Sequence, residues 1–363
     1  MPGRLLAWTV ALAVAACGGP QERVIPEVAF DLPPDTILTR YVNVPVAAWV
    51  GGERWVVVAG EFDEAILADF DSGRLTRLGG RGDAELRNPF AVFGWADTAY
   101  VADWSLRRVT LWTSDGRFAG AFPSIEPLRG AFPVARDREG RLYVDMKPRP
   151  GRDGTGARDS AAVIRVGPDM ASFDTVVRLA PLDLAEVEDQ GGRRFERRVF
   201  SGEDQWGVHP DGTVWVARVY TNLIEVHGPD GRMSRSERLP DRVLEVTRTD
   251  REHFLLQFPE ELRSTADRIP VSPIKPPFEN ALGGTGGTVW LEKSRTVFDS
   301  TRSYQVVEAD AGVLSHVAVL PIKQGRIIAL GDSLALVAEQ YRDGVRLMQA
   351  RIPAPPPGPG GSP

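Results

Sequence analysis

The sequence is poor in cysteine, lysine and long apolar runs, and each shortage excludes a class of structure. Its only cysteine in 363 residues is Cys17, so no disulfide can form within the chain and the fold must be held by its core. The 43 Lys and Arg are outnumbered by 49 Asp and Glu, which gives a net charge of -6. A nucleic-acid partner is therefore not expected, because neutralising phosphates requires a basic face. The one marked apolar run, residues 5–16, is shorter than the roughly 20 residues of a membrane-spanning helix.

The first seventeen residues have the organisation of an export signal. A cationic start with Arg4 precedes the apolar run, and small residues follow it. Residues 14–17, Val-Ala-Ala-Cys, resemble the lipobox of bacterial lipoproteins. The resemblance implies that residues 1–16 are removed, that Cys17 carries lipid, and that Gly18 directs the protein to the outer membrane. We expect acyl chains to hold it on the membrane without spanning it, and an ordinary secreted start is the alternative.

Two low-complexity segments flank the expected domain. Residues 17–33, rich in Pro and Glu, are expected to tether the domain to its lipid, and residues 353–363 to form a flexible Pro/Gly tail. Residues 34–352 are then one domain. Its 42% hydrophobic and 25% charged residues are ordinary for a globular protein, and the 37 Gly and 29 Pro suit a turn-rich all-β chain.

Four short strands separated by tight turns recur along this domain. The clearest copy spans residues 90–122, with turns at Ala96-Asp97 and Asp115-Gly116. The first turn of the unit occurs at Gly52, Asp97, Gly140, Gly212, Gly287 and Asp332. These turns are 45, 43, 72, 75 and 45 residues apart, and propeller blades repeat at about 40–50 residues. The sequence therefore predicts an all-β fold, a six-bladed β-propeller with two inserted loop or helix segments.

The two long intervals each hold one insertion. We expect these at residues 181–204 and 241–276, and a third, shorter one at residues 148–159. The sixth unit has no clear fourth strand. Residues 36–41 are expected to complete it, because a closed ring leaves no free sheet edge.

A short helix is predicted inside the second large insertion. Thr249 and Glu252 have the spacing of a capping box. The helix should continue to about Phe258 and end at Pro259, because proline cannot continue it.

One blade resembles a known repeat. Residues 101–103 (Val-Ala-Asp), with 107–112 and 114–118 after them, are similar to an NHL-type repeat, and residues 78–83 with 88–90 are similar to the linker between such blades. The chain as a whole resembles the six-bladed β-propeller lipoproteins of bacteria. The resemblance implies the fold and the lipid anchor, and it assigns no reaction.

Carboxylates follow the second strand of five blades, where they are expected to ring one mouth of the central channel. They are Glu61, Asp103, Asp145, Glu292 and Glu339. A ring of oxygen ligands could hold a divalent cation, but carboxylates at such places commonly cap turns by accepting backbone N–H groups, and we favour the second interpretation. The four histidines occupy different places in the repeat, so no shared zinc site is expected.

Aromatic and cationic side chains are expected at the same mouth. They are Phe62, Trp104, Lys147, Arg218, Tyr220, Lys293, Arg295, Tyr341 and Arg342. These residue types concentrate binding energy, and loops on a rigid scaffold commonly present them. The other blade tryptophans are expected in the core: Trp55, Trp95, Trp112, Trp206, Trp215 and Trp290.

The sequence thus favours a monomeric, non-catalytic binding module without a cofactor. Its ligand would be a peptide, a glycan or a partner protein outside the cytoplasm. A metal-dependent propeller enzyme of the lyase or lactonase type, with a divalent cation in the channel, is the alternative.

Overall fold

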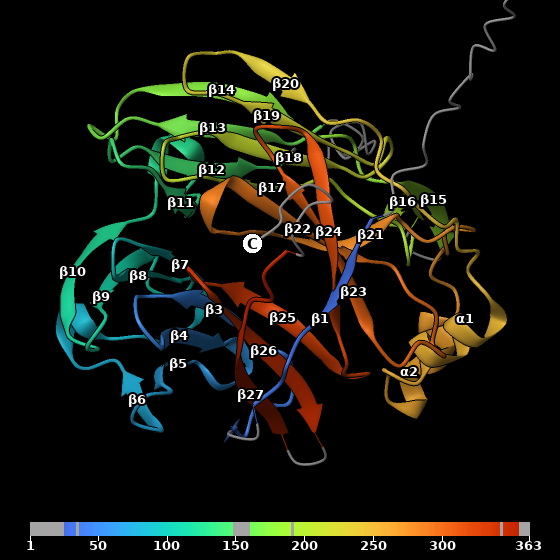
Figure 1. Ribbon diagram of the computed structural model, residues 1–363, viewed down its shortest axis with the longest axis horizontal. Helices are drawn as coiled ribbons and strands as arrows, with labels where there is room; N and C mark the ends of the chain where they lie inside the picture. The colour runs from blue at the N-terminus through green and yellow to red at the C-terminus, as the bar shows by residue number, and fades with distance from the viewer. Residues whose placement is uncertain (1–24, 34–35, 148–159, 190–191, 342–343, 356–363) are drawn as a thin grey trace, which may run out of the picture.

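The computed structural model of the protein describes residues 25–33, 36–147, 160–189, 192–341 and 344–355. The predicted signal peptide, Cys17, the 148–159 loop and most of the tail lie outside these residues. Nearly all regular structure in the described segments is β (Figure 1).

Six sheets of four or five strands follow one another along the described chain, and they are called blades 1 to 6 below. A seventh, two-stranded sheet lies in an insertion. Blade 1 contains β3 (Val46–Trp49), β4 (Arg54–Ala59), β5 (Glu64–Asp69) and β6 (Arg74–Leu78). Blade 2 contains β7 (Pro89–Trp95), β8 (Thr98–Asp103), β9 (Arg108–Thr113) and β10 (Phe118–Pro123). Blade 3 contains β11 (Pro133–Arg136), β12 (Leu142–Met146), β13 (Ala162–Val166) and β14 (Phe173–Arg178).

The second half of the ring has the same order. Blade 4 contains β17 (Gln205–Val208), β18 (Val214–Arg218), β19 (Leu223–His227) and β20 (Met233–Arg235). Blade 5 contains β21 (Phe278–Gly283), β22 (Thr288–Lys293), β23 (Arg302–Glu308), β24 (Val313–Leu320) and, at its outer edge, β1 (Glu27–Ala29). Blade 6 contains β25 (Gly325–Leu330), β26 (Leu334–Tyr341), β27 (Gly344–Arg351) and β2 (Ile37–Leu38).

The first strand of each blade is the innermost and contacts its counterparts in both neighbouring blades. The contacts run from β3 to β7, β11, β17, β21 and β25, and then back to β3. This closed series makes the protein a six-bladed β-propeller, as predicted (Figure 1).

The turn between the first and second strands falls where the repeat places it in every blade. Positive φ explains the residues found there: Gly52 has φ +57°, Gly140 +80° and Gly212 +89°, and glycine adopts this region without a Cβ penalty. Because the strands alternate in direction, these turns all lie on one face of the ring, called the turn face. The second strands end on the opposite face, called the loop face.

The N-terminal segment contributes to two blades. Strand β2 pairs antiparallel with β27, with Ile37 opposite Leu347, so it completes blade 6 as predicted. Strand β1 pairs in parallel with β24, and Phe30 is buried against Trp290. The tether predicted over residues 17–33 is therefore wrong for its last part, because that segment covers the open edge of β24.

The 181–204 insertion is a hairpin of β15 (Leu184–Asp189) and β16 (Gly192–Arg197), and the 241–276 insertion holds α1 (Arg248–Leu255) and α2 (Glu260–Ala266). Val199 of one insertion bridges Val271 of the other, so the two pack together beside the ring (Figure 1). No helix of the described segments has the length and apolarity to cross a bilayer.

The predicted helix start is wrong by two residues. Thr247 is the N-cap of α1, and its partner in the capping box is Asp250, whose carboxylate accepts from the Thr247 backbone N–H at 2.9 Å. An aspartate at the third helical position closes the box as the expected Glu252 would. Pro259 is the N-cap of α2. Proline is tolerated at a helix start, because no helical hydrogen bond there needs its missing N–H.

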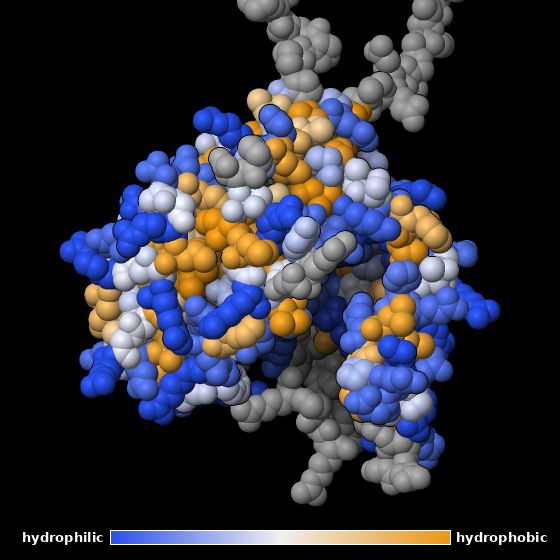
Figure 2. All heavy atoms as spheres, turned by 90° about the horizontal axis from the view of Figure 1, so that it is seen from below, coloured by the Kyte–Doolittle hydropathy of each residue, from blue (hydrophilic) through white to orange (hydrophobic). Residues whose placement is uncertain are grey.

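The core lies between adjacent blades. Trp55 and Val57 of blade 1, for example, pack with Leu336 and Ala338 of blade 6. The second strands are buried on both faces, which makes each blade a wedge fixed between its neighbours. Edge on, charged and apolar residues are mixed over the visible surface (Figure 2).

Candidate ligand-binding site

The aromatic and cationic residues predicted at a channel mouth lie at or just after the ends of second strands, which puts them on the loop face. Many of them are engaged by neighbours. Arg218 pairs with Asp204 at 2.7 Å and with Glu225, and Lys293 pairs with Asp241 at 2.6 Å.

The remaining members of that set are spread over several blades. Among the aromatic residues, Trp104 contacts Phe90 and Phe132, Phe62 contacts Tyr41, and the Tyr341 ring lies under the Arg346 guanidinium. The Tyr220 hydroxyl donates to the Pro181 carbonyl, and Arg295 donates to the Lys323 carbonyl. Lys147 lies near Asp145. Arg342 lies outside the described residues. No member lines either of the two cavities described below, so their role as a binding mouth stays a prediction.

Two of the five predicted carboxylates cap turns. Asp103 is fully buried and accepts backbone N–H groups of Arg87, Asn88 and Leu106 at 2.7, 3.1 and 2.8 Å. Glu61 accepts from two backbone N–H groups, at 2.9 and 3.0 Å. These contacts are those of the turn-capping interpretation.

The other three carboxylates have cationic neighbours. Glu292 is buried and pairs with Arg326 at 2.8 Å and with Arg302, while Glu339 lies 3.4 Å from Arg346. Asp145 lies 3.9 Å from Lys147, and burial raises the pKa of its carboxyl. Within the described part of the chain, no three His, Cys, Asp or Glu side chains are grouped as metal ligands would be.

A cavity of about 750 Å³ opens on the propeller axis at the turn face, and it is called the central pocket. Residues from the ends of all six innermost strands line it. Its aromatic walls come from Trp49, Trp95, Trp206 and Trp215. The last three were predicted in the core, and Trp215 is a buried core residue, while Trp95 and Trp206 pack partly buried against the core. The sequence did not predict this pocket, because strand spacing does not show how close a residue lies to the propeller axis.

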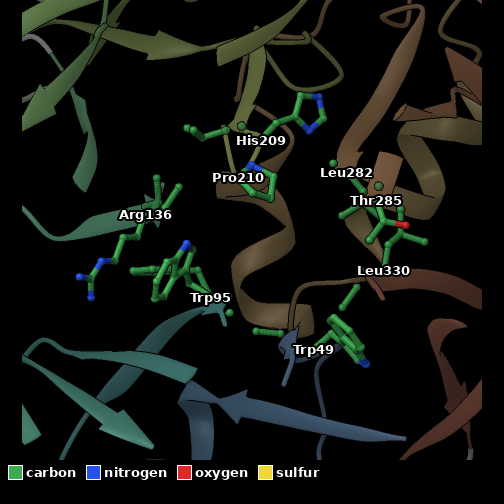
Figure 3. A pocket seen from close by; sticks show the side chains of 18 of the residues that line it. Trp49, Trp95, Arg136, His209, Pro210, Leu282, Thr285 and Leu330 are labelled. Atoms are coloured by element: carbon green, nitrogen blue, oxygen red, sulfur yellow. The ribbon is translucent and has the colours of Figure 1, made fainter. Parts of the chain in front are cut away.

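Arg136 is fixed on one side of the central pocket (Figure 3). Its Cζ atom lies 4.7 Å from the ring centroid of Trp95, and its Nη1 donates to the Tyr100 hydroxyl at 2.5 Å. A guanidinium over an indole face is attracted by the negative charge of the ring face. Arg136 of blade 3 is thereby positioned by two aromatic side chains of blade 2.

Trp215 presents an unusual polar atom to the pocket wall. The residue is 2% exposed, and its Nε1–H has no hydrogen-bond partner among the described residues. By contrast, Nε1 of Trp49 donates to the Gly52 carbonyl at 2.8 Å and Nε1 of Trp112 to the Thr110 hydroxyl at 2.9 Å. An unpaired buried donor is costly.

Two glycines let the Trp215 indole reach the innermost strands. A Cβ on Gly207 would lie 3.0 Å from Nε1, and one on Gly283 would lie 3.2 Å from it. Both glycines line the central pocket. The indole edge therefore sits directly behind backbone that faces the axis.

The charges on the pocket wall balance. Asp97 and Asp332 are matched by Arg136 and Arg138. His209 is also a lining residue (Figure 3) and is 7% exposed. Burial lowers the pKa of its imidazole, against an opposing effect of nearby carboxylates, so the ring is neutral at pH 7.

No protein-family model matches this sequence, and neither does any curated protein. Solved structures do resemble it. Virginiamycin B lyase of Staphylococcus aureus has 8% identity and a TM-score of 0.46, covering 89% of this chain and 100% of that one. A DUF4221 family member from Bacteroides vulgatus has 11% identity and a TM-score of 0.48, covering 89% and 94%.

A calcium-binding protein, regucalcin, of Agrobacterium tumefaciens has 11% identity and a TM-score of 0.43, covering 92% of this chain and 99% of that one. At such identities a likeness concerns the fold alone. The propeller assignment rests on the strand order and the closed ring of contacts.

Proposed function

We propose that this protein is a non-catalytic binding module that holds a glycan segment in the central pocket. The observation that carries the proposal is the gathering of four indoles around one axial cavity of about 750 Å³. Ligand sites are concave and mostly apolar, with a few placed polar groups. Indole faces contact the C–H faces of sugar rings, while the Arg136 guanidinium is a donor for hydroxyl oxygens.

The balanced charge of the wall favours a neutral ligand over an ionic one. A pocket wall with a net charge would favour a ligand of the opposite charge. Here the two Asp and two Arg side chains on the wall give it no net charge. A polyhydroxylated ring with apolar faces matches both the aromatic surface and the Arg136 donor. A neutral peptide segment is the competing ligand.

Binding should be measured by tryptophan fluorescence and calorimetry, with neutral oligosaccharides and neutral peptides as probes. The variant Trp95→Ala should weaken oligosaccharide binding at least about tenfold, which corresponds to about 1.4 kcal/mol. Trp104→Ala is the matched control, because that indole is 59% exposed on the opposite face. Saturable binding of neutral peptides instead of oligosaccharides would show that the ligand is a peptide. Equal weakening of binding by Trp95→Ala and Trp104→Ala would contradict binding in the central pocket.

We also propose that the module is exported and anchored to the outer membrane by lipid on Cys17. The support is the sequence of residues 1–19, which combines a cationic start, an apolar run and the lipobox resemblance. Intact-mass measurement of the mature protein should show an N-terminus at Cys17 with added acyl mass. Cys17→Ala should release the protein from the membrane fraction, and a mature chain that retains residues 1–16 would contradict the anchor.

A further inference from the structure

A second cavity of about 300 Å³ lies where the two insertions return to the ring. It is enclosed by residues 200–205, which follow the hairpin, and by residues 275–279, which lead from the helical insertion into β21. Arg197 and Ser294 complete its lining. The cavity is at the loop-face ends of β17 and β21 and shares no lining residue with the central pocket, so we call it the insertion pocket.

Lys275 places an ammonium group in a fixed position at this pocket. Its side chain is 7% exposed, and its Nζ donates to Asp250 Oδ1 at 2.6 Å and to the Arg295 carbonyl at 2.7 Å. An ammonium group carries three donors, so one N–H remains for another acceptor. The Phe200 ring centroid, 5.9 Å from Nζ, forms an apolar wall beside it.

Ser294 adds a second unused polar group. Its Oγ is buried and has no hydrogen-bond partner among the described residues. The Ser294 backbone N–H lies 3.5 Å from the Pro277 carbonyl, which places this hydroxyl beside the segment that connects Lys275 to Glu279. A buried hydroxyl without a partner is unfavourable unless something else occupies the site.

Glu279 supplies an anion at the other end of the same segment. The guanidinium nearest to it is that of Arg302, at 3.8 Å, which is longer than a hydrogen bond. Although the Glu279 side chain is 38% exposed, desolvation by the surrounding protein atoms, and then the nearby Glu292 charge, raise the pKa of its carboxyl. A bound cationic amine would relieve both effects, because an opposite charge stabilises the ionised form.

We infer that the insertion pocket binds a free α-amino acid. The carboxylate would accept from the remaining N–H of Lys275 and from the Ser294 hydroxyl, while the ammonium group donates to Glu279. The volume is at the lower end of the range for ligand pockets, roughly 300–1,000 Å³. It is too small for an extended chain and suits one amino acid.

The test uses the full mature protein and the twenty amino acids, each followed by calorimetry and by the shift in Tm. At least one amino acid should bind saturably, while propionate and ethylamine, each carrying one of the two charged groups, should bind at least tenfold more weakly than alanine. Glu279→Gln should weaken amino-acid binding at least tenfold, and Ser294→Ala should weaken it to a smaller extent. Both substitutions leave the Lys275–Asp250 pair in place, so neither removes a buried ion pair.

Trp95→Ala is the control, because it alters the central pocket alone. Equal binding to the wild-type protein and to both Glu279→Gln and Ser294→Ala would overturn the inference. So would the absence of saturable binding for all twenty amino acids, and so would propionate binding as tightly as alanine. Loss of amino-acid binding in Trp95→Ala would place the ligand in the central pocket and would equally overturn it.

Discussion

Arg136 crosses the boundary between blades 2 and 3 and holds the two together at the rim of the central pocket. Its Cζ is 4.7 Å from the Trp95 ring centroid, and its Nη1 is 2.5 Å from the Tyr100 hydroxyl oxygen. The same side chain therefore joins two blades and shapes the wall that a ligand would touch.

Replacing Arg136 by Leu should reduce both stability and binding. The contact with Trp95 and the hydrogen bond to Tyr100 together account for an expected loss of about 1–2 kcal/mol in the free energy of unfolding. Urea denaturation measures it. Arg138→Leu is the control, since Arg138 also lines the pocket but is exposed and should change stability by less than about 0.5 kcal/mol. Equal losses in the two variants would contradict the bracing role of Arg136.

Gly207 should not tolerate a side chain. The Cβ of an alanine there would lie 2.5 Å from Cζ2 of Trp215, so the indole or the strand must move. We expect Gly207→Ala to cost about 1–3 kcal/mol of stability, as overpacking of a core does. Gly60→Ala, whose Cβ would meet the Pro89 carbonyl at an ordinary 3.7 Å, is the control. A thermal melt that ranks the two variants equally would show that Trp215 has room to shift.

Asp103 and Glu61 both accept backbone N–H groups from the segment before the first strand of their blade, and burial should separate their contributions. Asp103→Ala strands three backbone N–H groups next to a fully buried site, and we expect a loss of about 2–4 kcal/mol in unfolding free energy. Glu61→Ala should lose less than about 1 kcal/mol, because Glu61 is exposed and water can replace its carboxylate. Denaturant titration without added metal measures both losses. Equal losses of unfolding free energy in Asp103→Ala and Glu61→Ala would contradict the role of burial.

Mild acid should destabilise the protein in part through His209. Burial lowers the pKa of its imidazole in the folded state, so below about pH 6.5 the unfolded chain takes up the proton more readily. Stability from this group is complete above that pH and is lost as the pH falls. His209→Gln should therefore flatten the decline in Tm between pH 7 and pH 5.

The flattening should be partial, because burial also lowers the pKa of His227 and His316. His253→Gln is the matched control, since that imidazole is exposed on α1. A slope unchanged by His209→Gln, or changed equally by His253→Gln, would show that His209 does not contribute.

The repeat in the sequence was sufficient to predict the ring. Turn residues such as Gly52 and Gly212 mark the blades, because their positive φ requires glycine or a similarly tolerant residue. The closing strand was also predictable, since Ile37 and Leu38 are needed where blade 6 lacks a fourth strand. The parallel pairing of β1 was not, because the sequence marks no partner for an isolated three-residue strand.

Those predicted mouth residues that the structure describes lie on the loop face, and the central pocket opens on the turn face. Trp95 and Trp206 were expected in the core because their spacing matches that of the blades. In the structure Trp95 ends β7 and Trp206 is the second residue of β17. Both pack partly buried against the core, as expected, and both also line the central pocket. The period of a strand tells which residues share a blade face, but it does not tell how close those residues lie to the propeller axis.

The sequence by itself determined the number of blades, the places of the insertions and the identity of the turn residues, because these depend on local backbone preference and on spacing. The tertiary structure alone decided that four indoles converge on the axis. It also decided that Lys275, Ser294 and Glu279 border one cavity. The tryptophans come from blades 1, 2 and 4 and are brought together by ring closure. Lys275, Ser294 and Glu279 are instead brought together by the first hairpin of blade 5 and the end of the insertion that leads into it.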